Sequence, residues 1–204
     1  MAFIVFVSFK LIGSNQDAGT GLSQGVIAPK FAAPSGRGTL TGYANVFQTH
    51  ASAVSSGRKQ AACEVTDKDA IRVCDYFNRP LVMVFWSTKC GDCGHAVTKV
   101  QKLRARYPDV NFLAVATVDS VKDVKSRIDK EGWTIPVAVD QDGRVGALYN
   151  VAIPPATFFI FKGEKAKQGQ NAKVMHSAID QLSDTALADD IERLIRASRK
   201  QGRS

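Results

Sequence analysis

The sequence is poor in residues that bind metal ions. It contains three histidines in 204 residues, His50, His95 and His176, and no two of them have the spacing of ligands to one metal. Among its four cysteines, a single Cys-x-x-Cys pair occurs, Cys90 and Cys93. A structural zinc site commonly needs a second such pair. The sequence therefore predicts no metal site and no cofactor.

A nucleic-acid-binding pattern is also lacking. Lys and Arg number 27 and Asp and Glu 19, so the formal net charge is +8. A surface for nucleic acid would interleave a basic patch with aromatic side chains, and no such patch occurs in a chain with 8% aromatic residues. We interpret the positive charge as a solvated surface and expect no nucleic-acid partner.

No run of about 20 apolar residues, the length that crosses a bilayer, is present. Residues 1–12 are nevertheless apolar, with no basic segment before them and no small-residue cleavage site after them. Residues 13–36 are rich in Gly, Ser, Asn, Gln, Ala and Pro, as linkers are. A core strand is the alternative for the apolar end. We expect residues 1–12 to be the remnant of an N-terminal membrane anchor, 13–36 a flexible linker and 37–204 the folded domain.

The residues that are present fit one well-packed domain. Apolar residues make up 45% of the chain and charged residues 23%, as in ordinary globular proteins. Continuous apolar runs at 81–85 and 110–118 are typical of parallel strands covered on both faces. The further expected elements are helices at 93–107, 119–130 and 183–198 and strands at 135–139, 157–161 and 173–176. Strands that alternate with helices predict an α/β sandwich.

Chemically reactive residues stand where the first of these strands passes into a helix. Backbone N–H groups at a helix start carry partial positive charge, which favours a thiolate over a thiol. We therefore expect Cys90 to be an exposed nucleophile and Cys93, about one turn inward, to be the resolving thiol. The neighbouring Lys89 would favour the Cys90 thiolate and Asp92 would oppose it. The balance of these two effects stays open.

A second pair of cysteines lies upstream. Thr66, with an acid three residues later, predicts a helix over residues 66–77, and this helix would turn Cys74 into the core. Two inert buried thiols and a disulfide between Cys63 and Cys74 are both possible. In an oxidising compartment we expect the disulfide, which would stabilise the fold by about 3 kcal/mol through closure of a short loop.

Four segments, in order, resemble the thioredoxin superfamily, and within it the membrane-anchored extracytoplasmic thioredoxin-like proteins of the cytochrome c maturation type. They are GVIAPKF at 25–31, FWSTKCGDC at 85–93, DQDGRVGALYNV at 140–151 and PPATFF at 154–159. The resemblance extends over residues 25–200. It implies a thioredoxin-like three-layer α/β/α sandwich with a central mixed sheet and an N-terminal extension.

The resemblance also implies roles for residues around the cysteine pair. Pro155 would be a cis proline that leaves a backbone edge free for an extended substrate, and Trp86, Lys89 and Ala156 would support the site. Pro154 is a departure that would narrow or stiffen this approach. A related bacterial branch carries a similar cysteine pair upstream, which supports the structural disulfide.

Other departures affect proton transfer. Lys89 stands where these proteins often have an aromatic residue, and Asp92 where proline is common. Val84 and Ala96 stand where relatives often hold a buried acid. Without that acid, proton transfer to Cys93 would use water or another group, so the rate is affected more than the activity itself.

Two classes of function follow. The first is an extracytoplasmic thiol-disulfide oxidoreductase on the outer face of a bacterial cell membrane, in which the Cys90 thiolate attacks a disulfide and Cys93 resolves the mixed disulfide. The resemblance implies disulfide or dithiol proteins such as apocytochrome c as substrates and a membrane thiol donor as partner. It favours reduction, but the same cysteines run in reverse would oxidise a dithiol, and the direction depends on a reduction potential that the sequence does not encode. The second is a copper-delivery module completed by His95 or His176, although such modules usually have Cys-x-x-x-Cys. A non-catalytic thioredoxin-like binding domain is a further alternative.

Overall fold

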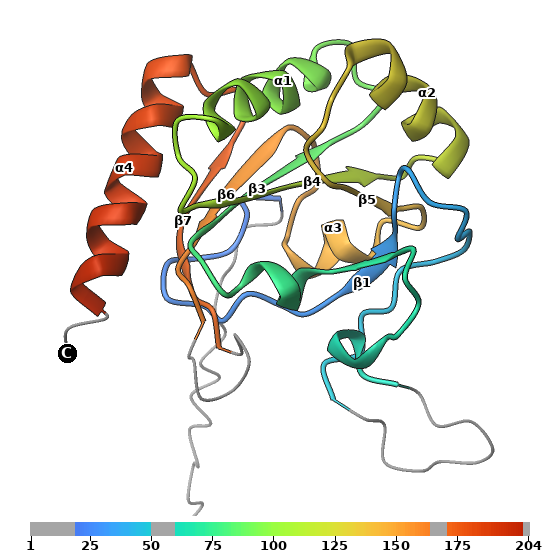
Figure 1. The fold of residues 1–204 in the computed structure, drawn as a ribbon, viewed down its shortest axis with the longest axis horizontal. Coiled ribbons are helices and arrows are strands. Elements are labelled where there is room, and N and C mark those ends of the chain that lie inside the picture. The colour runs from blue at the N-terminus through green and yellow to red at the C-terminus, as the bar shows by residue number, and fades with distance from the viewer. Residues whose placement is uncertain (1–18, 50–59, 164–170, 202–204) are drawn as a thin grey trace, which may run out of the picture.

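The computed structural model describes residues 19–49, 60–163 and 171–201 of the chain. The strands of its main sheet are β3 (Leu81–Trp86), β4 (Asn111–Thr117), β5 (Val137–Asp140), β6 (Ala156–Ile160) and β7 (Val174–Ile179). They lie in the order β5-β4-β3-β6-β7 (Figure 1). Pairing is parallel between β3, β4 and β5, and antiparallel from β3 to β6 and from β6 to β7. This is the α/β architecture that the sequence pattern predicts, with the central mixed sheet that the resemblance implies.

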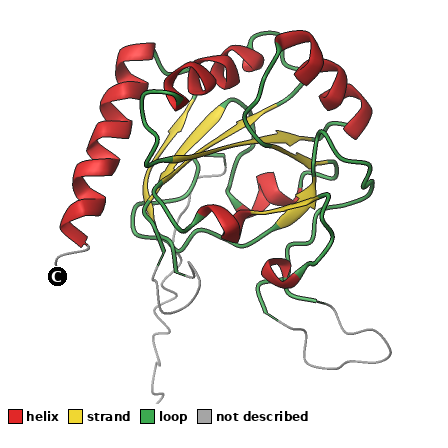
Figure 2. Cartoon of the chain, viewed as in Figure 1, coloured by secondary structure: helices red, strands yellow, loops and turns green. Residues whose placement is uncertain are grey.

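Both faces of this sheet are covered (Figures 1 and 2). On one face lie α1 (Cys93–Arg104), α2 (Val121–Glu131) and α4 (Asp184–Gln201). On the other lie α3 (Arg144–Leu148), the short 3-10 helix η2 (Val73–Tyr76), and a small sheet of β1 (Ala32–Pro34) and β2 (Ala70–Arg72). A further 3-10 turn, η1 (Ala62–Glu64), precedes β2.

The central strand β3 supports the layers on both sides. Successive side chains of a strand point to opposite faces, so Trp86 packs with the α1 side and Phe85 with the α3 side. Every residue of β3 is buried, which is why its sequence is a continuous apolar run rather than an alternating one. The segment that follows β3 and contains Cys90 is therefore attached to a rigid, fully buried strand.

Residues 19–36 belong to the folded domain and not to a flexible linker. Phe31 is 0% exposed and packs edge-on against the ring of Tyr149, with 6.1 Å between centroids. β1 is buried and pairs with β2. The linker prediction for 13–36 is therefore wrong over its described part. Alanine and proline are common in linkers, but they are also small enough to pack closely against a sheet.

Residues 1–18, which include the predicted anchor at 1–12, lie outside the described residues. Within the described ranges, no helix has both the length and the apolarity that crossing a membrane requires. Anchoring through residues 1–12 stays a prediction.

The helix predicted over residues 66–77 is wrong: β2 and η2 occupy most of this stretch. Asp67 accepts a hydrogen bond from the Asp69 N–H (2.8 Å), and the Asp69 carboxylate accepts from the Thr39 N–H and hydroxyl (2.8 and 2.7 Å). The acids therefore form a turn and a long-range contact instead of a capping box. Cys74 is accordingly half-buried at the margin of the core instead of pointing into it.

Candidate functional site

Cys90 and Cys93 lie where β3 passes into α1, as the sequence pattern predicts, and a disulfide joins them with 5.5 Å between their Cα atoms. Cys90 precedes the helix and is half-buried. Cys93 is its first residue and is 0% exposed, within the core on the α1 side of the sheet. The two sulfur atoms therefore differ in accessibility, and only Cys90 faces the surface.

A cis peptide bond joins Pro154 and Pro155, directly before the strand β6 that pairs with β3. Ala156, the first residue of β6, pairs with Phe85 at the end of β3, so the two prolines stand beside the cysteines. Pro154 lines the same cavity as Cys90. The Pro155 carbonyl accepts a hydrogen bond from the Asp180 N–H (2.9 Å). The cis form that the resemblance implies for Pro155 is present.

The charged neighbours of Cys90 are both directed elsewhere. The Lys89 ammonium donates to the Val118 carbonyl at 2.6 Å. Asp92 is the N-cap residue of α1, but its side chain makes no capping hydrogen bond and lies 3.8 Å from His95 Nδ1. The Asp92 carbonyl accepts from the Gln181 side chain at 2.6 Å. The backbone before Cys93 is thus tied to the segment that precedes α4.

Asp119, which sequence reasoning missed, contacts the two residues that begin the connection from β3 to Cys90. It is 1% exposed and accepts hydrogen bonds from the Thr88 N–H (2.7 Å), the Thr88 hydroxyl (2.6 Å) and the Ser87 hydroxyl (3.3 Å). Its carboxylate thereby fixes the residues that lead to Cys90. A signal was available in the sequence: Asp119 follows the apolar run of β4, the parallel strand next to β3, which leads into the cysteine motif.

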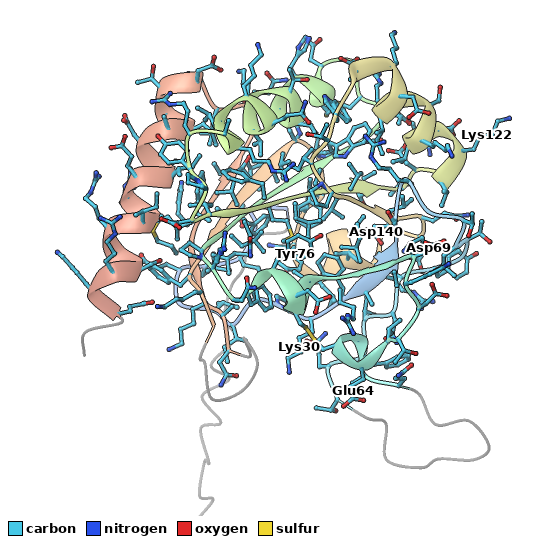
Figure 3. The ribbon with its side chains drawn as sticks, viewed as in Figure 1. Lys30, Glu64, Asp69, Tyr76, Lys122 and Asp140 are labelled. Carbon is cyan, nitrogen blue, oxygen red and sulfur yellow. A yellow bond between two sulfur atoms is a disulfide. The ribbon has the colours of Figure 1, made fainter. Side chains whose placement is uncertain are left out.

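A second buried carboxyl group belongs to Asp140, the last residue of β5 (Figure 3). It accepts from the Val145 N–H (3.0 Å), the Gly146 N–H (2.8 Å) and the Thr117 hydroxyl (3.0 Å). Burial raises the pKa of Asp140, and these hydrogen bonds offset only part of that effect. The carboxyl joins the first turn of α3 to the ends of β4 and β5.

An open cavity of about 270 Å³ lies beside Cys90. Lys89, Val118, Ala152 and Pro154 contribute to its walls. Val118 has a positive φ of 57°, unusual for a β-branched residue, and is 52% exposed. A hydrogen bond from its N–H to the Asp140 carbonyl (2.8 Å) holds it there. Apolar surface is thus presented next to the accessible sulfur.

Of the histidines that the structure describes, neither His95 nor His176 completes a metal site with the cysteines. His176 stacks on Phe159 with 5.9 Å between ring centroids, and Phe159 pairs with Val82 near the far end of β3. His95 is on the exposed side of α1. Within residues 19–49, 60–163 and 171–201, no group of three or more His, Cys, Asp or Glu side chains could hold a metal ion. This geometry gives the copper alternative no support.

The upstream cysteines are paired as well. A disulfide joins Cys63, in η1, to Cys74, in η2, with 5.8 Å between Cα atoms. Its Cys74 packs against the apolar core on the α3 side of the sheet, whereas Cys93 lies in the core on the α1 side. The two disulfides therefore occupy separate parts of the fold.

Residues 57–168, more than half of the chain, match the AhpC/TSA family. The thiol-disulfide oxidoreductase ResA of Oceanobacillus iheyensis is 30% identical over 131 residues, which are 63% of this chain and 68% of that protein. The soluble secreted antigen MPT53 of Mycobacterium tuberculosis is 27% identical over 110 residues, which are 54% of this chain and 63% of that protein.

Solved structures agree with the predicted fold class. A Chlorobium tepidum protein described as a thiol:disulfide interchange protein DsbE has a TM-score of 0.59 and 20% identity, covering 87% of this chain and 98% of that one. That likeness concerns the fold, and it confirms the thioredoxin-like sandwich. Together with the family match and the relatives named as oxidoreductases, it identifies this chain as a member of the AhpC/TSA family and a thioredoxin-like thiol-disulfide oxidoreductase.

Proposed function

We propose that Cys90 and Cys93 are the redox pair and that the protein reduces disulfides of protein substrates outside the cytoplasm. The observation that carries this proposal is the unequal exposure of the two cysteines. Cys90 is half-buried beside an open cavity, while Cys93 is 0% exposed. A nucleophile must meet the substrate, whereas a resolving thiol must meet only the mixed disulfide.

The reaction begins from the dithiol form. The Cys90 thiolate attacks one sulfur of the substrate disulfide, and the other substrate sulfur leaves as a thiolate and takes up a proton. Cys93 then loses its proton and attacks the Cys90 sulfur, which releases the second substrate thiol and closes the enzyme disulfide. Two electrons pass from the enzyme to the substrate. The unpaired N–H groups at the start of α1 favour the charged form of Cys90.

The Pro154–Pro155 segment shapes how a substrate is held. A proline has no backbone N–H, so neither residue can donate to an extended substrate chain. The Pro155 carbonyl is already engaged by Asp180. Pairing at this edge would therefore use the Pro154 carbonyl as an acceptor, and exposed apolar side chains would supply further contact. Ile153 and Val118, 73% and 52% exposed, are the residues placed for this.

Several observations support an extracytoplasmic location. A disulfide such as Cys63–Cys74, remote from the redox pair, persists in oxidising compartments. The relative MPT53 is named as a secreted protein. Return to the dithiol form needs an electron source, for which we propose a membrane thiol donor, with the protein held at the membrane through residues 1–12. Apocytochrome c is the protein substrate we propose to test first.

Trapping distinguishes the roles of the two cysteines. Cys93→Ser should accumulate a mixed disulfide between Cys90 and a substrate protein, stable until a thiol is added. Cys90→Ser should trap nothing and should not catalyse insulin reduction by dithiothreitol. Trapping by Cys90→Ser and not by Cys93→Ser would reverse the assigned roles. Stoichiometric copper binding without any trapped partner would favour the metal-delivery alternative instead.

A further inference from the structure

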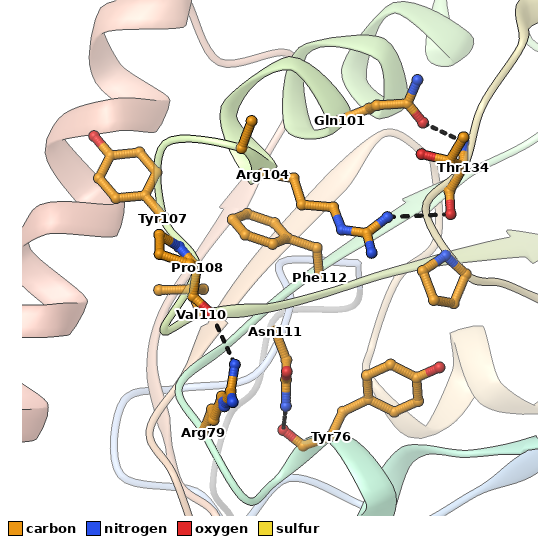
Figure 4. Close-up of a pocket in the computed structure, with 12 residues that line it drawn as sticks. Tyr76, Arg79, Gln101, Arg104, Tyr107, Pro108, Val110, Asn111, Phe112 and Thr134 are labelled. Carbon is orange, nitrogen blue, oxygen red and sulfur yellow. Dashed lines mark hydrogen bonds between the residues drawn. The ribbon is translucent and has the colours of Figure 1, made fainter.

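A second cavity lies at the end of the sheet opposite the redox pair (Figure 4). Its volume is about 620 Å³. Its walls come from η2, the start of β4, the last turn of α1 and the segments that follow α1 and α2. Cys90, by contrast, follows the carboxyl end of β3. We call this cavity the arginine groove, because Arg79 and Arg104 line it from two sides of Phe112.

Both guanidinium groups are oriented by backbone carbonyls. Arg79 Nη1 donates to the Pro108 carbonyl at 2.8 Å, and Arg104 Nη1 donates to the Thr134 carbonyl at 3.2 Å. Each guanidinium has five N–H donors, so most remain for a ligand. Among the described residues, no carboxylate forms an ion pair with either arginine, and no Asp or Glu lines the groove.

Hydrogen bonds hold the walls of the groove in place. Gln101 on α1 accepts from the N–H groups of Thr134 (2.5 Å) and Ile135 (3.2 Å). Asn111 at the start of β4 donates to the Tyr76 carbonyl and to the Asn78 side chain, both at 2.7 Å. A cavity whose walls are already joined loses little conformational freedom when a ligand enters.

The floor of the groove is apolar and partly aromatic. Phe112 and Val110 are 4% and 5% exposed, and Tyr76 and Pro136 also line the cavity. Burial, more than the nearby Asp75, raises the pKa of Tyr76, and Arg104 offsets part of this. The Tyr76 phenol is therefore neutral at physiological pH and keeps its proton as a hydrogen-bond donor.

We propose that the arginine groove binds an organic oxyanion, a phosphate or carboxylate carried on an apolar or aromatic body. A guanidinium presents paired donors that match the oxygens of these groups. The apolar floor would cover the body of the ligand, and the volume lies within the range of about 300–1,000 Å³ typical of small-molecule sites. This site is separate from the redox pair, and the proposal does not depend on the redox function.

Titration of the isotope-labelled full-length protein with phenyl phosphate, followed by NMR, tests the proposal. We expect saturable one-to-one shifts centred on the backbone amides of Asn111 and Thr134. Arg79→Ala and Arg104→Ala should each weaken binding about tenfold, since loss of one charge-assisted contact has an effect of that order. Inorganic phosphate should bind more weakly than phenyl phosphate, because it cannot use the floor.

Lys122→Ala serves as the matched control, because Lys122 is an exposed cation on α2, away from the groove (Figure 3). It should bind phenyl phosphate as the wild type does. Absence of saturable binding, or equal binding by the Arg79→Ala/Arg104→Ala double variant, would overturn the proposal. Insulin reduction by the double variant should be unchanged, so this result is separable from failure of the redox assignment.

Vesicles distinguish two sources of the same oxyanion chemistry. Binding to phosphatidylglycerol vesicles and not to phosphatidylcholine vesicles, lost in the double variant, would identify a lipid headgroup as the ligand. Saturable binding of phenyl phosphate that such vesicles do not displace would identify a free organic anion. Equal binding of the wild type and the double variant to both kinds of vesicle would contradict a lipid ligand for the groove.

Discussion

At the scale of single residues, Asp119 controls the position of the chain that leads to Cys90. Its buried carboxylate accepts three hydrogen bonds from Ser87 and Thr88. Val118, the residue before Asp119, accepts a hydrogen bond from the Lys89 ammonium through its carbonyl. Residues 118 and 119, just after β4, thus hold the three residues that precede Cys90.

We expect Asp119→Asn to lower the free energy of unfolding by about 1–3 kcal/mol, because a buried acceptor loses its charge-assisted hydrogen bonds. Insulin reduction should slow as well, since the Thr88 backbone is no longer held. Urea unfolding and turnover measure the two effects. Asp129→Asn, at an exposed site on α2, is the control. Unchanged turnover in Asp119→Asn would show that Thr88 is positioned by other contacts.

The raised pKa of Asp140 predicts how the stability of the fold depends on pH. Its pKa is raised in the folded protein, so the folded state holds this proton to higher pH than the unfolded state does. The unfolded state then binds fewer protons, and stability falls as pH rises above the unfolded pKa of about 3.9. Stability contributed by the protonated form is present below that pKa and is lost as pH rises through the folded pKa.

Replacement of Asp140 by asparagine should remove this contribution to the pH dependence. We expect the free energy of unfolding of the wild type, relative to Asp140→Asn, to decrease from pH 4 upward until the folded carboxyl is ionised. Urea unfolding at a series of pH values measures the difference. A relative stability that rises over the same interval would mean that hydrogen bonds to the ionised carboxylate outweigh its burial.

At the scale of elements, the N-terminal segment closes one face of the sheet. The ring of Phe31 meets Tyr149, and Tyr149 in turn packs against Phe85 and Phe158, with centroids 5.4 and 5.2 Å apart. The Tyr149 hydroxyl donates to the Pro29 carbonyl at 2.7 Å. Aromatic contacts therefore join a segment of linker-like composition to the strand that supports Cys90.

Phe31→Ala should reduce the free energy of unfolding by about 3–5 kcal/mol, because it removes a fully buried aromatic side chain and leaves a cavity. Ile27→Ala is the matched control in the same segment: Ile27 is 49% exposed, and its loss should change stability by about 0.5 kcal/mol or less. Equal, small effects in both variants would restore the flexible-linker interpretation of this segment.

The sequence predicts well those elements whose own residue pattern shows which of their faces are buried. The buried runs of β3 and β4 and the apolar spacing of α1 indicate a covered sheet without knowledge of its neighbours. The stretch over residues 66–77 is different, because its backbone pairs with β1, far away in the sequence. A local helix-start signal at Thr66 carries no information about that partner, so tertiary pairing overrides it.

The candidate site shows the same division. Cys90, Cys93 and Pro155 are found from motif and resemblance, since their spacing and order are local. Asp119 and Asp140 are not, because their role depends on which strands become neighbours. Each acid follows an apolar strand, and only the parallel order of β3, β4 and β5 places both near the motif. Sequence composition likewise gave no sign of the arginine groove.

At the scale of the whole molecule, the two disulfides lie in different surroundings. Cys90–Cys93 lies at the start of α1, where Cys90 lines an open cavity, and the two residues are three apart in sequence. Cys63–Cys74 joins η1 to η2 beside the small sheet, outside the main sheet. Reduction of the first opens the pair that we propose as redox-active, whereas reduction of the second frees a peripheral part of the fold.

Mild dithiothreitol should therefore reduce Cys90–Cys93 first, and peptide mapping after differential alkylation should find Cys63 and Cys74 still paired. A Cys63→Ser/Cys74→Ser double variant should unfold with a free energy about 2–4 kcal/mol lower, because the unfolded chain gains the freedom that the cross-link removes. Its insulin reduction at a temperature where it stays folded should equal that of the wild type. Loss of turnover in the folded double variant would mean that the second disulfide supports the redox site after all.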